Sequence, residues 1–131
     1  MTDEIKKIIL YKINRSYETL EEAEIMGKYN HWNACVNRLY YACFYAVSAL
    51  LLTENLSSSK HTGVRSLFNK NFVKPGLIVE DLGELYNELF ENRQESDYTD
   101  FVTMKEDIVR LWIDKTRIFL DKIQILINQK T

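Results

Sequence analysis

The sequence predicts an all-α fold, an up-and-down bundle of about five helices, and two observations support this prediction. The 131 residues include one proline and four glycines, and so few chain breakers favour long helices over a turn-rich sheet. Apolar residues also recur at spacings of three and four over long segments, which is the period of a helix and not of a strand. The length suits one domain, 1–131, and a hydrophobic content of 46% is typical of a globular protein.

The first two predicted helices are long. One is expected over about 3–29, with Thr2 or Asp3 as its N-cap, and the other over about 31–53. The second helix is apolar around most of its circumference, which is typical of a central bundle helix or of an oligomer interface. Its polar stripe occupies a sector of roughly 140° and contains Asn33, Asn37, Arg38, Tyr41, Tyr45 and Ser48. Four of these form a secondary set of candidate binding residues, namely Asn37, Arg38, Tyr41 and Tyr45.

The remaining helices are expected after a polar loop. A short third helix is predicted over about 60–72 and a fourth over about 79–93. A loop over about 94–101 then leads to a last helix, which Thr103 caps and which ends near residue 128. Short loops between neighbouring helices make antiparallel packing the simplest arrangement.

Antiparallel packing brings polar residues from separate segments to one end of the predicted bundle. The third helix starts where the second helix ends, and the fourth helix returns toward that start if it packs against the third. An arginine there suits a phosphate clamp and a tyrosine can stack or form a hydrogen bond, although the same residues can also form a capping network. The candidate binding site comprises Lys60, His61, Arg93, Asp97 and Tyr98.

The charge pattern excludes one class of partner and leaves another open. The formal net charge is −2 with a pI near 5.7, so the chain lacks the broad basic face of a protein that binds any nucleic acid avidly. Segment 60–74 nevertheless has four bases and no acid, whereas segment 80–100 has eight acids. The two segments either pair with each other across a solvated face, or the basic one meets a nucleic acid or an acidic partner.

No sequence feature predicts a metal, a cofactor or a membrane. Cys35 and Cys43 are too far apart on one helix to form a disulfide, so we expect two small buried residues. With only two histidines and no glycine-rich phosphate loop, no multi-histidine metal site and no cofactor is expected. The N-terminus lacks a secretory pattern, and the apolar run 42–52 is too short for a bilayer, so we expect a cytoplasmic protein.

Three segments resemble the bacterial and archaeal HEPN domains. Residues 37–46, NRLYYACFYA, resemble the N-R-x-Y-Y-A-x-F signature, and residues 60–68, KHTGVRSLF, resemble K-H-x-G-V-x-x-L-F. Residues 85–98 resemble a segment that ends in R-x-x-x-D-Y, and the whole resemblance covers about 5–125. It implies a helical bundle with a four-helix core that often forms a homodimer. It also implies a small nucleotidyltransferase as a partner, in a toxin–antitoxin-like pair.

The resemblance carries an expectation about activity as well. Many HEPN proteins are metal-independent ribonucleases that use an arginine followed, four to six residues later, by a histidine. Arg93 matches this arginine, but Asp97 and Tyr98 stand where the histidine would be, and neither matches an imidazole as a proton carrier near neutral pH. We therefore predict a binding module that acts with a nucleotidyltransferase and binds a nucleotide or RNA weakly. The alternatives are a ribonuclease that uses Arg93 with His61, and a purely structural dimer.

Overall fold

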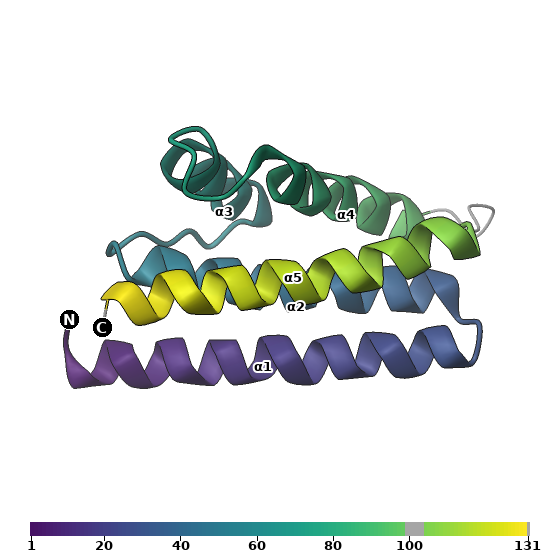
Figure 1. Ribbon diagram of the computed structural model, residues 1–131, viewed down its shortest axis with the longest axis horizontal. Coiled ribbons are helices and arrows are strands. Elements are labelled where there is room, and N and C mark those ends of the chain that lie inside the picture. The colour runs from purple at the N-terminus through teal and green to yellow at the C-terminus, as the bar shows by residue number, and fades with distance from the viewer. Residues whose placement is uncertain (99–103, 131) are drawn as a thin grey trace.

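The computed structural model describes the backbone of residues 1–98 and 104–130, and the side chains of residues 1–93 and 104–130. All regular elements in this part of the chain are helical, which confirms the predicted all-α class. They are α1 (Asp3–Lys28), α2 (Trp32–Leu52), α3 (His61–Phe68), the π-helix η1 (Asn69–Val73), α4 (Glu80–Tyr98) and α5 (Glu106–Lys130). In Figure 1, α1, α2 and α5 run lengthwise side by side, and α3 and α4 cover one side of them.

Helix α1 has the boundaries and the buried stripe that its sequence predicts. The Thr2 side chain caps it by accepting a hydrogen bond from the Ile5 backbone N–H at 3.2 Å. The helix ends before Asn30, which takes a positive φ of 62° and turns the chain into α2. The buried face holds Ile9, Ile13, Ser16, Thr19, Leu20, Ala23 and Gly27.

Helix α2 is the central helix of the bundle. It contacts α1, α3, α4 and α5, and most of its apolar residues are buried inside the single chain. By length and composition α2 is apolar enough to cross a membrane, but 61% of its most apolar window is buried among the other helices, as in a core helix. Its apolarity therefore does not require a second copy of the chain. Burial also raises the pKa of Cys35 to about 11 and of Cys43 to about 12, which confirms them as small core residues.

The segment between α2 and α3 runs back along the bundle, so α3 does not begin at the end of the bundle as the sequence reasoning assumed (Figure 1). The Leu56 N–H donates to the Leu51 carbonyl at 3.0 Å, and Asn55 has a φ of 57°, which together reverse the chain. Helix α3 then begins beside the middle of α2, where the rings of His61 and Phe44 stack with centroids 4.4 Å apart. The cause is a loop that packs on the helix it has just left.

Gly63 is the residue that lets this loop lie so close to α3. A Cβ atom at Gly63 would lie 2.8 Å from the Cβ of Ser58 and closer still to its hydroxyl. A larger residue there would push the loop away from the helix. The glycine of the K-H-x-G-V segment thus holds the returning loop against the start of α3.

The helices after the loop differ from the predicted ones in two places. The predicted helix over about 60–72 changes at Asn69 into a π-helix, because the Lys74 N–H bonds to the Asn69 carbonyl five residues back, at 2.8 Å. Helix α4 continues to Tyr98, so the prediction of a loop from residue 94 was wrong. Helix α5 begins at Glu106, and the proposed cap Thr103 lies outside the described residues.

Candidate functional site

Tyr40 on α2 is the centre of the site. Its side chain is fully buried, and its hydroxyl lies 2.6 Å from His61 Nδ1 on α3. Its ring stacks against the ring of Tyr86 on α4, with centroids 5.9 Å apart, and Phe90 meets it edge-on at the same distance. Burial raises the pKa of Tyr40 to about 12, so the phenol keeps its proton at neutral pH. Tyr40 therefore ties α2, α3 and α4 together.

His61 is held in a fixed orientation by three aromatic residues of α2. Phe44 stacks on its ring, Tyr40 bonds to its Nδ1, and Tyr41 meets it edge-on at 5.9 Å. Burial lowers the pKa of His61, and the positive charge of Arg93 lowers it further. His61 is therefore a half-buried imidazole that is mainly neutral at neutral pH.

Arg93 on α4 lies beside the same tyrosines. Its guanidinium carbon is 4.8 Å from the ring centroid of Tyr40 and 5.9 Å from that of Tyr41. Contacts at such distances are cation–π interactions. The predicted proximity of His61 and Arg93 is thus confirmed, although they meet at the middle of the bundle and not at its end.

Arg38 brings the polar stripe of α2 into this site. Its guanidinium carbon lies 5.2 Å from the Tyr41 ring centroid, so two arginines flank one half-buried tyrosine. Arg38 also contacts Asn37 Oδ1 at 2.9 Å and, more distantly, Glu22 at 3.4 Å. Residues of the two predicted candidate sets therefore meet, with Arg38 and Tyr41 from one set and His61 and Arg93 from the other. We call the joint set the cationic cluster, defined as Arg38, Tyr40, Tyr41, His61 and Arg93.

The other predicted site residues stand in different positions. Lys60 precedes α3, and its exposed side chain makes no hydrogen bond or ion pair with a described residue. Tyr45 lies further along α2, where the Arg15 guanidinium approaches its ring to 5.3 Å. The side chains of Asp97 and Tyr98 lie outside the described residues, so their part in the site stays a prediction.

Tyr40 and Phe44 were not among the candidate site residues that the sequence predicted. Both do pack in the core, but they also seat His61. The available signal was their place in the Y-Y-A-x-F segment, which this sequence contains together with a histidine in the K-H-x-G-V segment. The two segments meet in space at His61.

The chemistry of the cluster favours an anion. Arginine offers a planar fork of donors that matches a phosphate, and nearby aromatic rings can stack on a base. The guanidinium groups of Arg38 and Arg93 approach one ring, so a phosphate bound beside Tyr41 would lie near two positive charges. Within the part of the chain whose side chains are described, no three histidine, cysteine, aspartate or glutamate residues gather where a metal could bind.

Residues 10–126 match the model of the HEPN domain family. A UPF0332 protein of Thermotoga maritima is 46% identical over 126 residues, which cover 96% of each chain. Two proteins of Methanocaldococcus jannaschii named putative toxins are each 35% identical to this chain. One match covers 72% of this chain and 65% of the relative, and the other covers 76% and 74%. The matched residues include the whole cationic cluster.

Proposed function

Because the chain belongs to the HEPN domain family, we propose that it is a binding module of a toxin–antitoxin-like system. In this proposal it binds the phosphate of an RNA or nucleotide at the cationic cluster and works with a small nucleotidyltransferase. The observation that carries the proposal is the convergence of Arg38 and Arg93 on Tyr41, beside His61. The relatives named putative toxins support the kind of system, and the nucleotidyltransferase partner is what the resemblance to HEPN domains implies.

The geometry favours binding over catalysis. Cleavage of RNA needs one group that removes a proton and another that supplies one. His61 has one nitrogen engaged with Tyr40 and one ring face against Phe44, which leaves a single nitrogen for a ligand. When the Tyr40 hydroxyl donates to Nδ1, the neutral imidazole carries its hydrogen on Nε2 and can donate it to a phosphate oxygen.

The pH dependence of RNA binding tests the role of His61 in this proposal. The pKa of His61 is lowered in the free protein, whereas a phosphodiester bound beside the ring would raise it, so binding takes up a proton. We therefore expect the affinity for a short single-stranded RNA to rise as the pH falls from about 8 to about 5.5. The gain in RNA affinity is at most about tenfold for each unit by which the bound phosphate raises the pKa of His61. Fluorescence anisotropy at constant ionic strength measures it.

The control for this experiment is His61→Gln, which keeps a hydrogen-bonding side chain and cannot titrate. Its RNA affinity should depend little on pH over the same range. His31 is exposed and lies at the start of α2, away from the cluster, so His31→Gln should keep the pH dependence of the wild type. An equal pH dependence in wild type and His61→Gln would show that His61 does not contact the phosphate.

One observation favours a second candidate function, a metal-independent ribonuclease. Tyr40 fixes His61 through Nδ1, and Arg93 lies against the Tyr40 ring. An imidazole and an arginine suited to a phosphate therefore stand beside the same tyrosine. The binding proposal predicts that purified protein, incubated with single-stranded RNA and a chelator, leaves the RNA intact. Gel analysis against His61→Ala and Arg93→Ala checks this. Cleavage by the wild type that both substitutions abolish would replace the binding proposal with the ribonuclease.

A further inference from the structure

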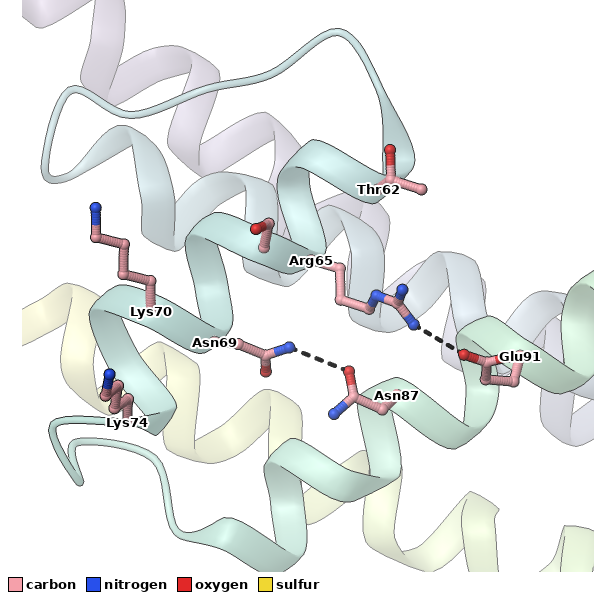
Figure 2. Close-up of a pocket in the computed structure, with 8 residues that line it drawn as sticks. Thr62, Arg65, Asn69, Lys70, Lys74, Asn87 and Glu91 are labelled. Atoms are coloured by element: carbon pink, nitrogen blue, oxygen red, sulfur yellow. Dashed lines mark hydrogen bonds and ion pairs between the residues drawn. The ribbon is translucent and has the colours of Figure 1, made fainter.

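A second polar concavity lies outside the cationic cluster. It is a groove of about 740 Å³ between the α3–η1 segment and α4 (Figure 2). We call it the basic groove, and the residues of it that matter here are Arg65, Asn69, Lys70, Lys74, Asn87 and Glu91. In Figure 2, Lys70 and Lys74 lie at one end of the groove, and Arg65 and Glu91 lie at the other.

The cations of the groove are compensated only at one end. Arg65 pairs with Glu91 at 3.0 Å, but the side-chain ammonium groups of Lys70 and Lys74 form no ion pair or hydrogen bond with any described residue. Two acids of α4 are engaged with α5, because Asp81 pairs with Lys115 at 3.1 Å and Glu88 accepts a hydrogen bond from Trp112 Nε1 at 3.2 Å. The idea that the basic and acidic segments neutralise each other therefore holds for one pair among the described side chains. Two lysines remain available to a ligand.

The fold maintains this concavity by local packing. The wide turn of η1 buries Phe72 and places Asn69 opposite α4, where its amide donates to Asn87 Oδ1 at 3.3 Å across the groove floor. Gly83 permits the close approach of η1 to α4, because a Cβ there would lie 2.8 Å from Val73 Cγ1. Single π-helical turns are frequent at functional sites, since they reposition side chains that an α-helix would place elsewhere.

The groove and the cationic cluster share one aromatic residue. The guanidinium of Arg65 lies 4.1 Å from the ring centroid of Phe90, and that of Arg93 lies 6.0 Å from the same centroid. Phe90 in turn meets the Tyr40 ring edge-on at 5.9 Å. Arginines of the two sites thus flank one ring, and a single extended polyanion can reach both.

We propose that the basic groove binds the backbone of a single-stranded RNA whose neighbouring phosphate occupies the cationic cluster. The lysines contact phosphates as point charges, and Asn87, whose Oδ1 accepts from Asn69, offers its Nδ2 as a donor to the edge of an unpaired base. An acidic peptide would also use the lysines, but a strand that carries a phosphate at every nucleotide supplies an anion for the cationic cluster as well, which Phe90 joins to the groove. The inference rests on the proposed function for the cluster and adds the class of ligand, a strand and not a mononucleotide.

Two ligands separate the groove from the cluster. The probes are AMP, whose single phosphate can occupy the cluster but cannot span both sites, and a fluorescent oligouridylate of about twelve nucleotides, which is long enough to reach both. Lys70→Gln with Lys74→Gln should weaken the binding of the oligonucleotide and leave the binding of AMP unchanged. The slope of log Kd against log salt for the oligonucleotide should fall by about 1.4, because each phosphate neutralised on a single strand contributes about 0.7. The matched control is Lys28→Gln with Lys122→Gln, which changes the net charge equally on α1 and α5.

Each outcome has a distinct meaning. An equal loss of oligonucleotide affinity in both double variants would show that the effect is one of net charge and would overturn the proposed role of the groove. An unchanged salt slope in Lys70→Gln with Lys74→Gln would overturn it as well. Lysine-dependent binding of polyglutamate without binding of oligouridylate would overturn it in favour of an acidic protein segment. Oligonucleotide binding that needs Lys70 and Lys74 but not Arg93, with no binding of AMP, would leave the groove standing and refute the proposed role of the cluster.

Discussion

Replacing Arg93 with alanine should weaken the binding of a short single-stranded RNA tenfold or more. The substitution removes a donor fork from the cationic cluster, and one hydrogen bond to a charged group contributes about 1.5–3 kcal/mol. Arg93→Lys should recover only part of the loss, because an ammonium keeps the charge but not the planar geometry that engages two phosphate oxygens. Anisotropy titrations at one fixed salt concentration compare the three proteins.

The thermal stability of the same variants separates a binding role for Arg93 from a structural one. The contact with the Tyr40 ring should contribute about 0.5–2 kcal/mol, so some lowering of the Tm is expected in Arg93→Ala. Lys122→Ala on α5 should leave both the Tm and RNA binding at wild-type values. If the wild type binds neither RNA nor any nucleotide while Arg93→Ala melts earlier, the cluster is structural. The chain would then act through protein contacts alone.

Replacing Tyr40 with alanine should lower the free energy of unfolding by about 3–5 kcal/mol, which is typical of a large aromatic residue removed from a core. Tyr40 is fully buried and contacts residues of α3 and α4, so its loss opens a cavity where three helices meet. Urea unfolding followed by circular dichroism measures the change. In thermal melts the Tm should fall by about 10 °C or more.

Tyr40→Phe is the matched control, because it keeps the ring and removes only the hydroxyl that bonds to His61. It should cost about 1 kcal/mol, the usual net contribution of one hydrogen bond. It should also weaken the pH dependence of RNA binding, since His61 loses the partner that orients it. A Tyr40→Phe protein as unstable as Tyr40→Ala would show that the hydroxyl, and not the packing of the ring, holds the three helices together.

The sequence by itself determined the fold class and most of the core. A spacing of three and four residues predicted the buried face of α1, because a helix repeats at 3.6 residues wherever it packs, and this face holds Ile9, Ile13, Ser16, Leu20 and Ala23. The apolar residues around most of the circumference of α2 predicted that it is a central helix. The HEPN family was also readable, since its signatures are short and contiguous. These features depend on neighbours along the chain, and sequence displays such neighbours directly.

Only the tertiary structure decided where the site lies and what belongs to it. From the sequence, His61 and Arg93 were expected together at one end of the bundle, because α3 was assumed to start there. In the structure the returning loop places His61 beside Tyr40, and Arg93 lies against the Tyr40 ring. The sequence could not show that Arg38 joins them at Tyr41, nor that a π-turn opens the basic groove. Such contacts depend on how a loop packs and how closely two helices approach. Those distances follow from side chains that fit together across the whole bundle, and no local period in the sequence encodes them.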